Sequence, residues 1–186
     1  MNRLNLILTI LIAAISFFSC SRSSIEKVGE KASIVSSTTV DTCFCNKGLC
    51  DYCVKVIRII DGDTFHGLTN DNMDVKFRIY AIDAPEKAQD FGTKSRQYLS
   101  DLIFGKKVGI KVQSKQDRYG RPIVWVYTDD GKDISAEMLK AGMAWHYKQY
   151  SKDEKYAELE NQARNGKIGL WTDKNLVAPW EFRKSR

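Results

Sequence analysis

The chain has 186 residues, enough for one domain of ordinary size with a short appendage and too few for two full α/β domains. Hydrophobic residues make up 43% and charged residues 28%, which excludes a disordered chain, while three Pro and twelve Gly exclude collagen-like and low-complexity proteins. A net charge of +6 favours an anionic partner such as nucleic acid, phosphate or an acidic surface.

The first residues have the pattern of an export signal. Arg3 supplies a positive charge, the run from Leu4 to Phe18 is almost wholly apolar, and Cys20 follows shortly after it. The run is shorter than the roughly 20 residues that a membrane-spanning helix needs. A Cys at this place resembles the lipobox of bacterial lipoproteins, in which the Cys becomes the lipid-modified N-terminus. We therefore predict a lipoprotein-type signal peptide over 1–19 and lipidation at Cys20.

This signal predicts an exported protein that is anchored by lipid to a bacterial membrane, on its periplasmic or cell-surface side. Ordinary cleavage to give a secreted protein is the alternative, and an uncleaved anchor is the third possibility. Residues 20–42 are rich in Ser and Thr, have no helical or strand periodicity, and carry charges that cancel. This composition predicts a flexible tether between the anchor and the domain.

A cysteine cluster follows the tether, within residues 43–53; its members are Cys43, Cys45, Cys50 and Cys53. An exported protein usually meets an oxidising compartment, so two disulfides are the first interpretation, although the sequence does not assign their pairing. A four-thiolate zinc site is the sharper alternative, and free thiols are the third. The cluster is expected to be structural in each case, because no general base lies near it in the sequence.

Five strands are predicted in the rest of the chain. Their segments are rich in Val, Ile and aromatic residues, or alternate apolar with polar residues, as half-buried strands do. The segments are 54–60, 64–68, 75–81, 107–112 and 123–127.

Three helices are predicted between and after these strands. The first covers roughly residues 93–104, with an apolar face and Gly105 in the place of a C-terminal cap. Ser135 is expected to cap the second, which stops near Gly142, and a capping box at 151–154 opens the third. Together these elements predict an α+β fold, a five-stranded OB-fold β-barrel with three helices packed outside it.

Acidic residues stand at the ends of the predicted strands, namely Asp61, Asp63, Asp83 and Glu86. Carboxylates at strand ends can converge and bind a hard cation such as calcium or magnesium. Each residue alone is more often a turn residue, because Asp-Gly is a common turn dipeptide. The segment 117–121 likewise is typical of a charged hairpin turn when it is considered alone.

Taken together, the motifs resemble the thermonuclease family, whose members are staphylococcal nuclease-like proteins. The segments are Asp61-Gly-Asp-Thr64, Arg78-Ile-Tyr-Ala-Ile-Asp-Ala-Pro-Glu86 and Asp117-Arg-Tyr-Gly-Arg121, continued by Ala141-Gly-Met-Ala144 and Gly169-Leu-Trp171. The resemblance covers residues 54 to about 180, so we place a nuclease domain at 54–182. It implies an OB-fold barrel that hydrolyses DNA and RNA with calcium as cofactor.

The resemblance also implies a metal site. By motif position, Asp63 and Asp83 would be carboxylate ligands of Ca²⁺, and Ala84 would add its backbone carbonyl. Many relatives carry Thr at the position of Ala84, but a backbone ligand survives that change. Glu86 would activate or orient the attacking water.

Basic residues of the same motifs would hold the substrate. Negative charge grows on the phosphate as a phosphodiester is cleaved, and guanidinium groups offer two-pronged donors to its oxygens. The resemblance implies that Arg78 and Arg121 grip the scissile phosphate. Arg118 would keep the positive charge that a Lys supplies in some relatives.

Aromatic side chains are candidates for stacking on bases. Tyr119 lies inside a motif, and relatives carry a tyrosine pair that lines the nucleotide site after the second helix. Tyr147 and Tyr150 are the candidates for this pair, with coverage of the barrel edge as the alternative. Trp180 is expected to pack, and the basic tail that begins at Arg183 is expected to be a solvated end.

Two other functions compete with catalysis. One is a catalytically inactive OB-fold module that binds nucleic acid or a protein, and the other is a structural lipoprotein with a disulfide-clamped barrel. Inactive relatives typically lose the charged residues, which this chain retains. We therefore expect a monomeric, calcium-dependent endonuclease acting on DNA and RNA.

Overall fold

The computed structural model describes Cys45 and residues 48–185. The proposed signal peptide, lipidation at Cys20, the tether and Cys43 fall outside the described residues. Within the part that is described, no helix is both long and apolar enough to cross a membrane.

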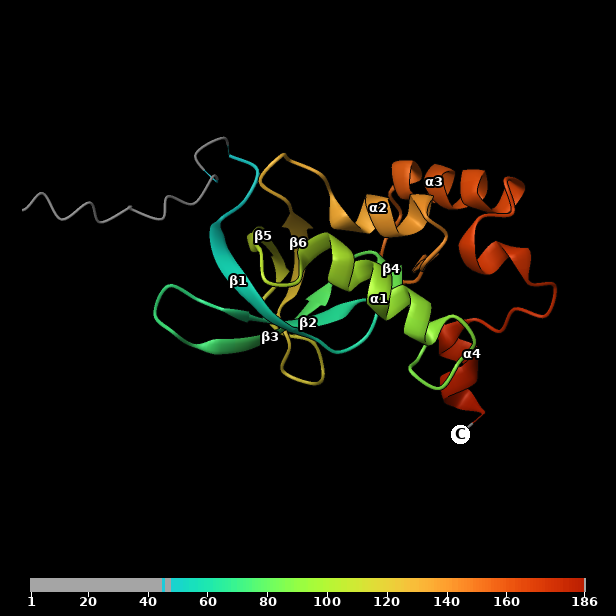
Figure 1. Cartoon of the computed structure of the whole chain (residues 1–186), viewed down its shortest axis with the longest axis horizontal. Coiled ribbons are helices and arrows are strands. Elements are labelled where there is room, and N and C mark those ends of the chain that lie inside the picture. Colours follow the sequence, from blue (N-terminus) through green and yellow to red (C-terminus); the bar gives the residue numbers. More distant parts are fainter. Residues whose placement is uncertain (1–44, 46–47, 186) are drawn as a thin grey trace, which may run out of the picture. The chain divides into compact units, whose positions relative to one another are not determined.

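Five strands close into a barrel in the order β1-β2-β3-β6-β5. Neighbouring strands run antiparallel except β3 and β6, which are parallel. Figure 1 shows this barrel beside the helices, and the sequence-based expectation of an OB-type α+β fold is confirmed. The strands are β1 (Tyr52–Ile59), β2 (Thr64–Leu68), β3 (Asp74–Ile79), β5 (Lys107–Ser114) and β6 (Ile123–Tyr127).

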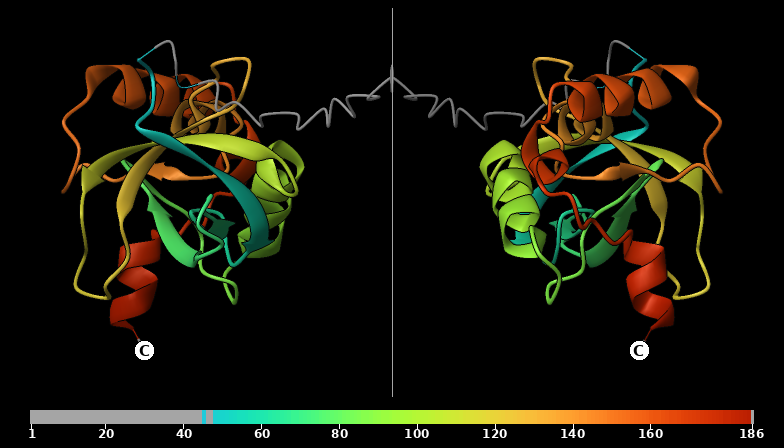
Figure 2. Two further views of the ribbon diagram at one scale, coloured as in Figure 1. Left: turned by 90° about the vertical axis from the view of Figure 1, so that its left-hand side faces the viewer. Right: turned by 90° about the vertical axis from the view of Figure 1, so that its right-hand side faces the viewer.

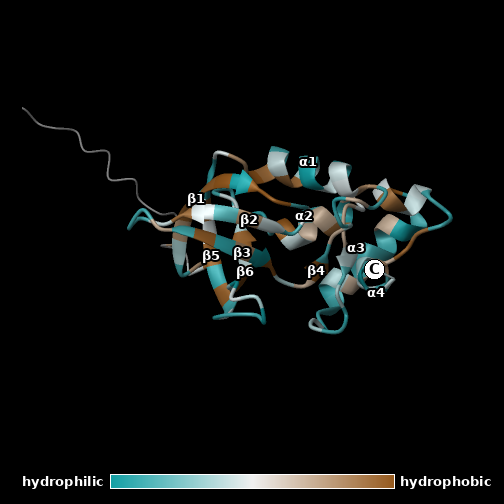
Figure 3. Ribbon diagram, turned by 90° about the horizontal axis from the view of Figure 1, so that it is seen from below, coloured by the Kyte–Doolittle hydropathy of each residue, from teal (hydrophilic) through white to brown (hydrophobic). Residues whose placement is uncertain are grey.

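The barrel is filled by the apolar side of its alternating strands. Phe65 of β2 and Phe77 of β3 are fully buried, and their rings stack with centroids 5.3 Å apart. A Cβ atom on Gly67 would lie 2.6 Å from a methyl carbon of Val54, so the close approach of β1 to β2 requires glycine there. Figure 3 shows apolar and hydrophilic residues alternating along the barrel strands.

Helices pack against this barrel and extend its core. Fully buried Leu99 and Ile103 come from the first helix and Met138 and Leu139 from the second. Both Figure 1 and Figure 2 show the second and third helices side by side. The remaining elements are α1 (Gly92–Ile103), α2 (Ile134–Lys140), α3 (Glu154–Asn165), the 3₁₀ helix η2 (Gly169–Thr172), α4 (Pro179–Lys184) and a small sheet of β4 (Ile82–Asp83) and β7 (Trp145–His146).

Two predicted caps and the number of helices were wrong. The side chain of Asp133 caps α2 by accepting from the backbone N–H groups of Ser135 and Ala136, while the Ser135 hydroxyl donates to a backbone carbonyl. Asp153 caps α3 in place of Ser151. In both cases the carboxylate lies directly before the helix, where it reaches the free N–H groups and its charge interacts favourably with the helix N-terminus. The described residues also include α4, which the sequence analysis did not predict.

The turn from β3 into β4 matters for the site. Ala81 lies in this turn with φ of 68°, a left-handed conformation that is uncommon for a residue with a side chain. Beyond it, β4 pairs with β7, so that Asp83 lies opposite Trp145. The tight turn thereby returns Asp83 to the side of Arg78, which lies only five residues earlier.

Candidate active site

Two buried aspartates form the floor of the site. Asp63 lies just before β2, and Asp83 lies in β4; they are 5% and 1% exposed. Asp63 accepts hydrogen bonds from the Thr64 hydroxyl at 2.9 Å and from the Ala84 backbone N–H at 2.7 Å. The structure thus joins both predicted carboxylate ligands and Ala84 in one place, because the Asp63 side chain links the β1–β2 turn to the residue after β4.

Arg78 connects the two aspartates. Its Nη2 lies 3.1 Å from Asp63 Oδ2 and 3.1 Å from Asp83 Oδ1, and its Nη1 donates to the carbonyl of Ile79. The β2–β3 ladder determines this position, because Arg78 is the partner of Thr64, the neighbour of Asp63. A buried pair of carboxylates therefore shares one fixed guanidinium.

A third carboxylate, that of Asp61, adds negative charge beside Asp63 and Asp83. Asp61 accepts a hydrogen bond from the backbone N–H of Asp63 at 3.1 Å. Burial raises the pKa of Asp61 to about 7, and repulsion from the Asp63 carboxylate adds to the effect. Burial also raises the pKa of Asp83. Oxygen donors whose charge is costly in this way fit a hard cation such as Ca²⁺, which would stabilise their ionised forms.

Glu86 lies at the exposed edge of these groups and has an unexpected partner. Its Oε1 lies 2.8 Å from Nη1 of Arg183, a residue of α4. The same guanidinium donates to both oxygens of Asp83, at 3.1 Å from Nη1 and at 2.7 Å from Nη2. The expectation of a solvated tail from Arg183 onward is therefore wrong for Arg183, which contacts both the predicted metal ligand and the predicted base.

The sequence contains a weak signal for this contact. Pro179 occupies the first turn of α4, where proline is favoured, and Trp180 follows it. An aromatic residue behind a helix-starting proline indicates a packed helix in place of a free tail. Figure 1 shows α4 beside the loop that precedes α1, and the side chain of Gln89 in that loop donates to the carbonyl of Val177 at 3.1 Å.

Arg121 and its neighbours lie in the loop between β5 and β6. Nε and Nη2 of Arg121 both donate to Oδ2 of Asp117, at 2.9 and 2.7 Å, and Nη1 donates to the Thr64 hydroxyl at 3.3 Å. Because the Thr64 hydroxyl also donates to Asp63, Thr64 links Arg121 to the buried aspartates. The guanidinium groups of Arg118 and Arg121 lie 4.8 and 5.3 Å from the centroid of the Tyr119 ring. Tyr119 is exposed to solvent.

The predicted tyrosine pair borders the site from the other side. The Tyr147 ring is tilted against that of Tyr150 at 5.0 Å and is stacked almost parallel on Trp180 of α4 at 5.6 Å. Burial raises the pKa of Tyr147, and the nearby charge of Asp83 adds to this. Tyr147 thus belongs to the site, while Tyr150 is mostly exposed. Trp180 packs, as expected from the sequence.

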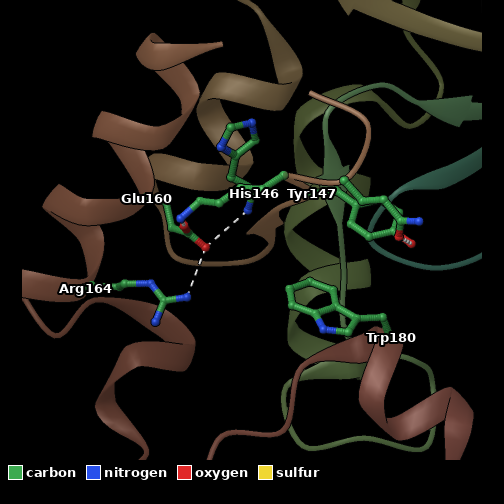
Figure 4. A pocket seen from close by; sticks show the side chains of 7 residues that line it. His146, Tyr147, Glu160, Arg164 and Trp180 are labelled. Carbon is green, nitrogen blue, oxygen red and sulfur yellow. Dashed lines mark hydrogen bonds and ion pairs between the residues drawn. The ribbon is translucent and has the colours of Figure 1, made fainter. Parts of the chain in front are cut away.

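A pocket of about 320 Å³ opens beside this aromatic stack. Figure 4 shows Trp180 and Tyr147 on one side of it and Arg164 on the other. Glu160 is buried at its base, where its carboxylate lies 3.1 Å from both Arg164 and Lys148. Its lining is His146, Tyr147, Lys148, Gln149, Glu160, Arg164 and Trp180.

The cysteine cluster is oxidised where it is described. Cys45 and Cys50 form a disulfide, Cys53 is also disulfide-bonded, and its Sγ lies 3.5 Å from that of Cys45. These three sulfurs are the only group of three His, Cys, Asp or Glu ligand atoms within 4.8 Å of one another among the described residues. Because a disulfide sulfur is not a thiolate, the group as it stands is not a zinc site.

Comparisons with known proteins point in one direction. Residues 76–173 match the family described as "Staphylococcal nuclease homologue". A protein named an uncharacterized endonuclease from Haemophilus influenzae is 43% identical over 147 residues, which are 79% of this chain and 79% of that protein. A protein named micrococcal nuclease from Shigella flexneri is 39% identical over 145 residues, 73% of this chain and 82% of that protein. A staphylococcal-like nuclease from Arabidopsis thaliana is 38% identical over 111 residues, 60% of this chain and 34% of that protein.

Proposed function

Since the chain belongs to the staphylococcal nuclease homologues, we propose that it is a calcium-dependent phosphodiesterase that hydrolyses both DNA and RNA as an endonuclease. The observation that carries the proposal is the buried cluster in which Arg78 joins Asp63 and Asp83. The relatives that bear nuclease and endonuclease names support a nuclease.

The proposed metal ligands are Asp63, Asp83 and the backbone carbonyl of Ala84. When bound, Ca²⁺ would supply Lewis-acid stabilisation to the phosphate and would lower the pKa of a water molecule. The chain provides buried carboxylates, and burial, with a smaller contribution from repulsion by the Asp63 carboxylate, raises the pKa values of Asp61 and Asp83. Two carboxylates and a carbonyl leave room for water, which suits the flexible coordination of calcium better than the strict geometry of magnesium.

The arginines are proposed to hold the phosphate. Arg78 and Arg121 are both oriented by carboxylates, and their side chains are 13% and 19% exposed, so the bonds fix each fork in place. A fixed guanidinium can donate two hydrogen bonds to the phosphate oxygens as negative charge grows on them. These contacts strengthen toward the transition state and therefore contribute to kcat.

Glu86 is the proposed general base. Its side chain is 36% exposed, so water can reach it, whereas Asp63 and Asp83 are buried. A carboxylate at the edge of the cluster can accept the proton of an attacking water within hydrogen-bond reach. Glu86 would thus act on water, while the two aspartates hold the metal.

Tyrosine rings beside the site are proposed to bind the nucleic acid strand. Tyr119, Tyr147 and Tyr150 can stack on bases, and Arg118 adds positive charge for the backbone. Stacking depends little on the base or the sugar, which favours action on both DNA and RNA. We propose that the protein acts as a monomer.

We also propose that the protein is exported and lipid-anchored at Cys20, with residues 20–42 as a tether to the nuclease domain at 54–182. The apolar run from Leu4 to Phe18, which ends just before Cys20, supports this. Mass spectrometry of protein from its native host should find an acylated Cys20 at the mature N-terminus. An unmodified terminus at Ser21 or beyond would favour the secreted form instead.

Digestion of plasmid DNA and of RNA by the full chain, with calcium and with a chelator, tests the proposed activity. Asp83→Ala should lower the rate of digestion at least about 100-fold. The change removes a proposed metal ligand, and it leaves the positive charge of Arg78 beside the site without one of its carboxylate partners. Asp71→Ala is the matched control, since Asp71 is an exposed aspartate in the β2–β3 turn. Full activity in chelator would overturn the metal assignment. DNA binding without cleavage would instead indicate an inactive binding module.

A further inference from the structure

The contact between α4 and the carboxylates has a consequence beyond the proposed activity. We propose that Arg183 is an internal cation that occupies the metal ligands until a divalent cation displaces it, so that α4 and the metal compete for Asp83. The inference rests on the proposed function, in that Asp83 is taken to be a metal ligand.

The geometry of the guanidinium leads to this competition. Arg183 contacts both carboxylate oxygens of Asp83, at 3.1 and 2.7 Å, and reaches Glu86 at 2.8 Å with the same nitrogen that contacts Oδ1. Arg78 takes a further position on Oδ1. A metal bound to Asp83, with a water molecule held by Glu86, would need the oxygens that Arg183 now occupies.

Charge makes joint occupancy unfavourable. A guanidinium and a divalent cation about 5 Å apart repel each other enough to weaken metal binding about tenfold, even with the dielectric constant of water. The carboxylates are buried, so screening there is weaker than in water. The repulsion therefore favours either Arg183 or the metal on Asp83 and disfavours both together.

The structure also indicates which partner moves. Asp83 is fixed in β4, with its side chain 2% exposed, whereas the side chain of Arg183 is 39% exposed in the last turn of a six-residue helix. Stacking of Trp180 on Tyr147 and the bond from Gln89 to the carbonyl of Val177 hold the segment around α4 in place. The arginine side chain can therefore leave Asp83 while the carboxylate stays in place.

Without metal, the same contact has a structural purpose. Asp61, Asp63 and Asp83 gather negative charge in a place where Arg78 is a single fixed counter-ion. Buried carboxylates that lack a cation are costly. Arg183 supplies the second positive charge, so the metal-free protein can keep its ligands together until a divalent cation arrives.

Calcium binding to the full chain, measured by isothermal titration calorimetry, tests the competition directly. Arg183→Gln should bind calcium about tenfold more tightly than the wild type, and Arg183→Lys should lie between them, because an ammonium lacks the two-pronged contact. Lys184→Gln is the matched control. It removes the same charge from the same helix, at an exposed residue outside the site, and should stay within about twofold of the wild type.

Hydrogen exchange provides a second measurement that does not depend on activity. If calcium displaces Arg183, the backbone N–H groups of residues 180–184 should exchange faster in wild-type protein with calcium than with chelator, since binding is reciprocal. In Arg183→Gln this difference should be much smaller. Loss of the contact with Asp83 also predicts a lower melting temperature for Arg183→Gln than for Lys184→Gln in chelator.

Three results would overturn the inference. Calcium affinity could be unchanged or weaker in Arg183→Gln, which would show that Arg183 does not oppose the metal. Affinity could rise equally in Lys184→Gln, which would reduce the effect to net charge. The wild type could bind no calcium; if it also digested DNA in chelator, the metal assignment of the proposed function would fall as well. In the first two results, calcium-dependent digestion would leave that function standing.

Discussion

Two groups of ligand-type side chains in this protein have opposite designs. In the cysteine cluster, Cys45, Cys50 and Cys53 lie within a few residues of one another, and their sulfurs are within 4.8 Å. In the other group, which we call the carboxylate–arginine cluster, the members come from several elements, Arg183 lies 100 positions from Asp83, and ion pairs hold them; they are Asp63, Arg78, Asp83, Glu86 and Arg183.

The difference shows that closeness of donors does not by itself make a metal site. The sulfurs are closest together, but oxidation has used their bonding capacity in covalent links. The carboxylates remain ionic, and an ion pair with arginine can be exchanged for one with a divalent cation. The sulfur group is therefore suited to holding the chain, and the carboxylate–arginine cluster to binding and chemistry.

The largest expected effect comes from removing the proposed base of the carboxylate–arginine cluster. Glu86→Gln should lower kcat by roughly 10²–10⁴-fold, the usual range for loss of general-base catalysis. Affinity for DNA should change little, because Glu86 acts on water. Steady-state kinetics would be compared with Glu158→Gln, an exposed glutamate of α3. A wild-type rate in Glu86→Gln would remove the general-base role and direct attention to Asp61.

Arg78 is the next test, because it is both a proposed phosphate ligand and the counter-ion of two aspartates. Arg78→Ala should lower kcat by about 10²–10³-fold, and Arg78→Lys should recover only part of this, since lysine cannot bond both carboxylates and phosphate in the same way. Arg58→Ala, at an exposed arginine of β1, is the control in the same assay. Full rescue by lysine would show that charge alone suffices and would contradict the two-pronged role.

Breaking the cysteine cluster should have a smaller effect, on stability alone. For a disulfide that spans five residues, such as Cys45–Cys50, the loss should cost about 2 kcal/mol of unfolding free energy. Cys45→Ala/Cys50→Ala should thus lower the midpoint of urea unfolding while keeping kcat within about twofold. A large loss of kcat in protein shown to be folded would contradict the division between the two groups.

The pairing of Cys53 can be checked on the same protein. Cys53 is disulfide-bonded, and we expect its partner to be Cys43, which completes two disulfides within residues 43–53. Mass spectrometry of a non-reduced digest should find these two peptides joined. Four alkylated thiols, or one bound zinc, would favour the other interpretations of the cluster.

The smallest expected effect is on the pH dependence of stability, and it comes from His146, which belongs to neither group. His146 is buried, neither ring nitrogen has a hydrogen-bond partner, and burial lowers its pKa. Below about pH 6.5 the unfolded chain takes up a proton that the folded one resists, so stability falls as the pH falls from about 6.5 toward the lower folded pKa. His146→Leu should remove this slope, worth less than about 1.4 kcal/mol per pH unit, in urea unfolding between pH 5 and 7. An unchanged slope would assign the effect to other groups.

Much of the fold could be predicted from the sequence, because it depends on local patterns. Turn signals, runs of β-branched and aromatic residues, and alternation predicted the strands: β2 and β6 lie at the predicted bounds, 64–68 and 123–127, and the other barrel strands lie within a few residues of theirs. The motif segments likewise identified Asp63, Arg78 and Asp83, which the structure joins. The pairing of Thr64 with Arg78 brings Asp63 to Arg78, and the turn at Ala81 returns Asp83 to Arg78 five residues later.

Other features required the tertiary structure. Asp133 and Asp153 cap their helices in place of nearby serines, since the choice among neighbouring acceptors depends on where the first turn forms. Ala81 adopts its left-handed turn because the surrounding fold imposes it. Arg183 meets Asp83 across 100 positions of sequence, and only the packing of α4 brings them together. The sequence determined which charged groups the protein has, whereas the tertiary structure decided their partners, because ion pairing depends on distance in space and not on spacing along the chain.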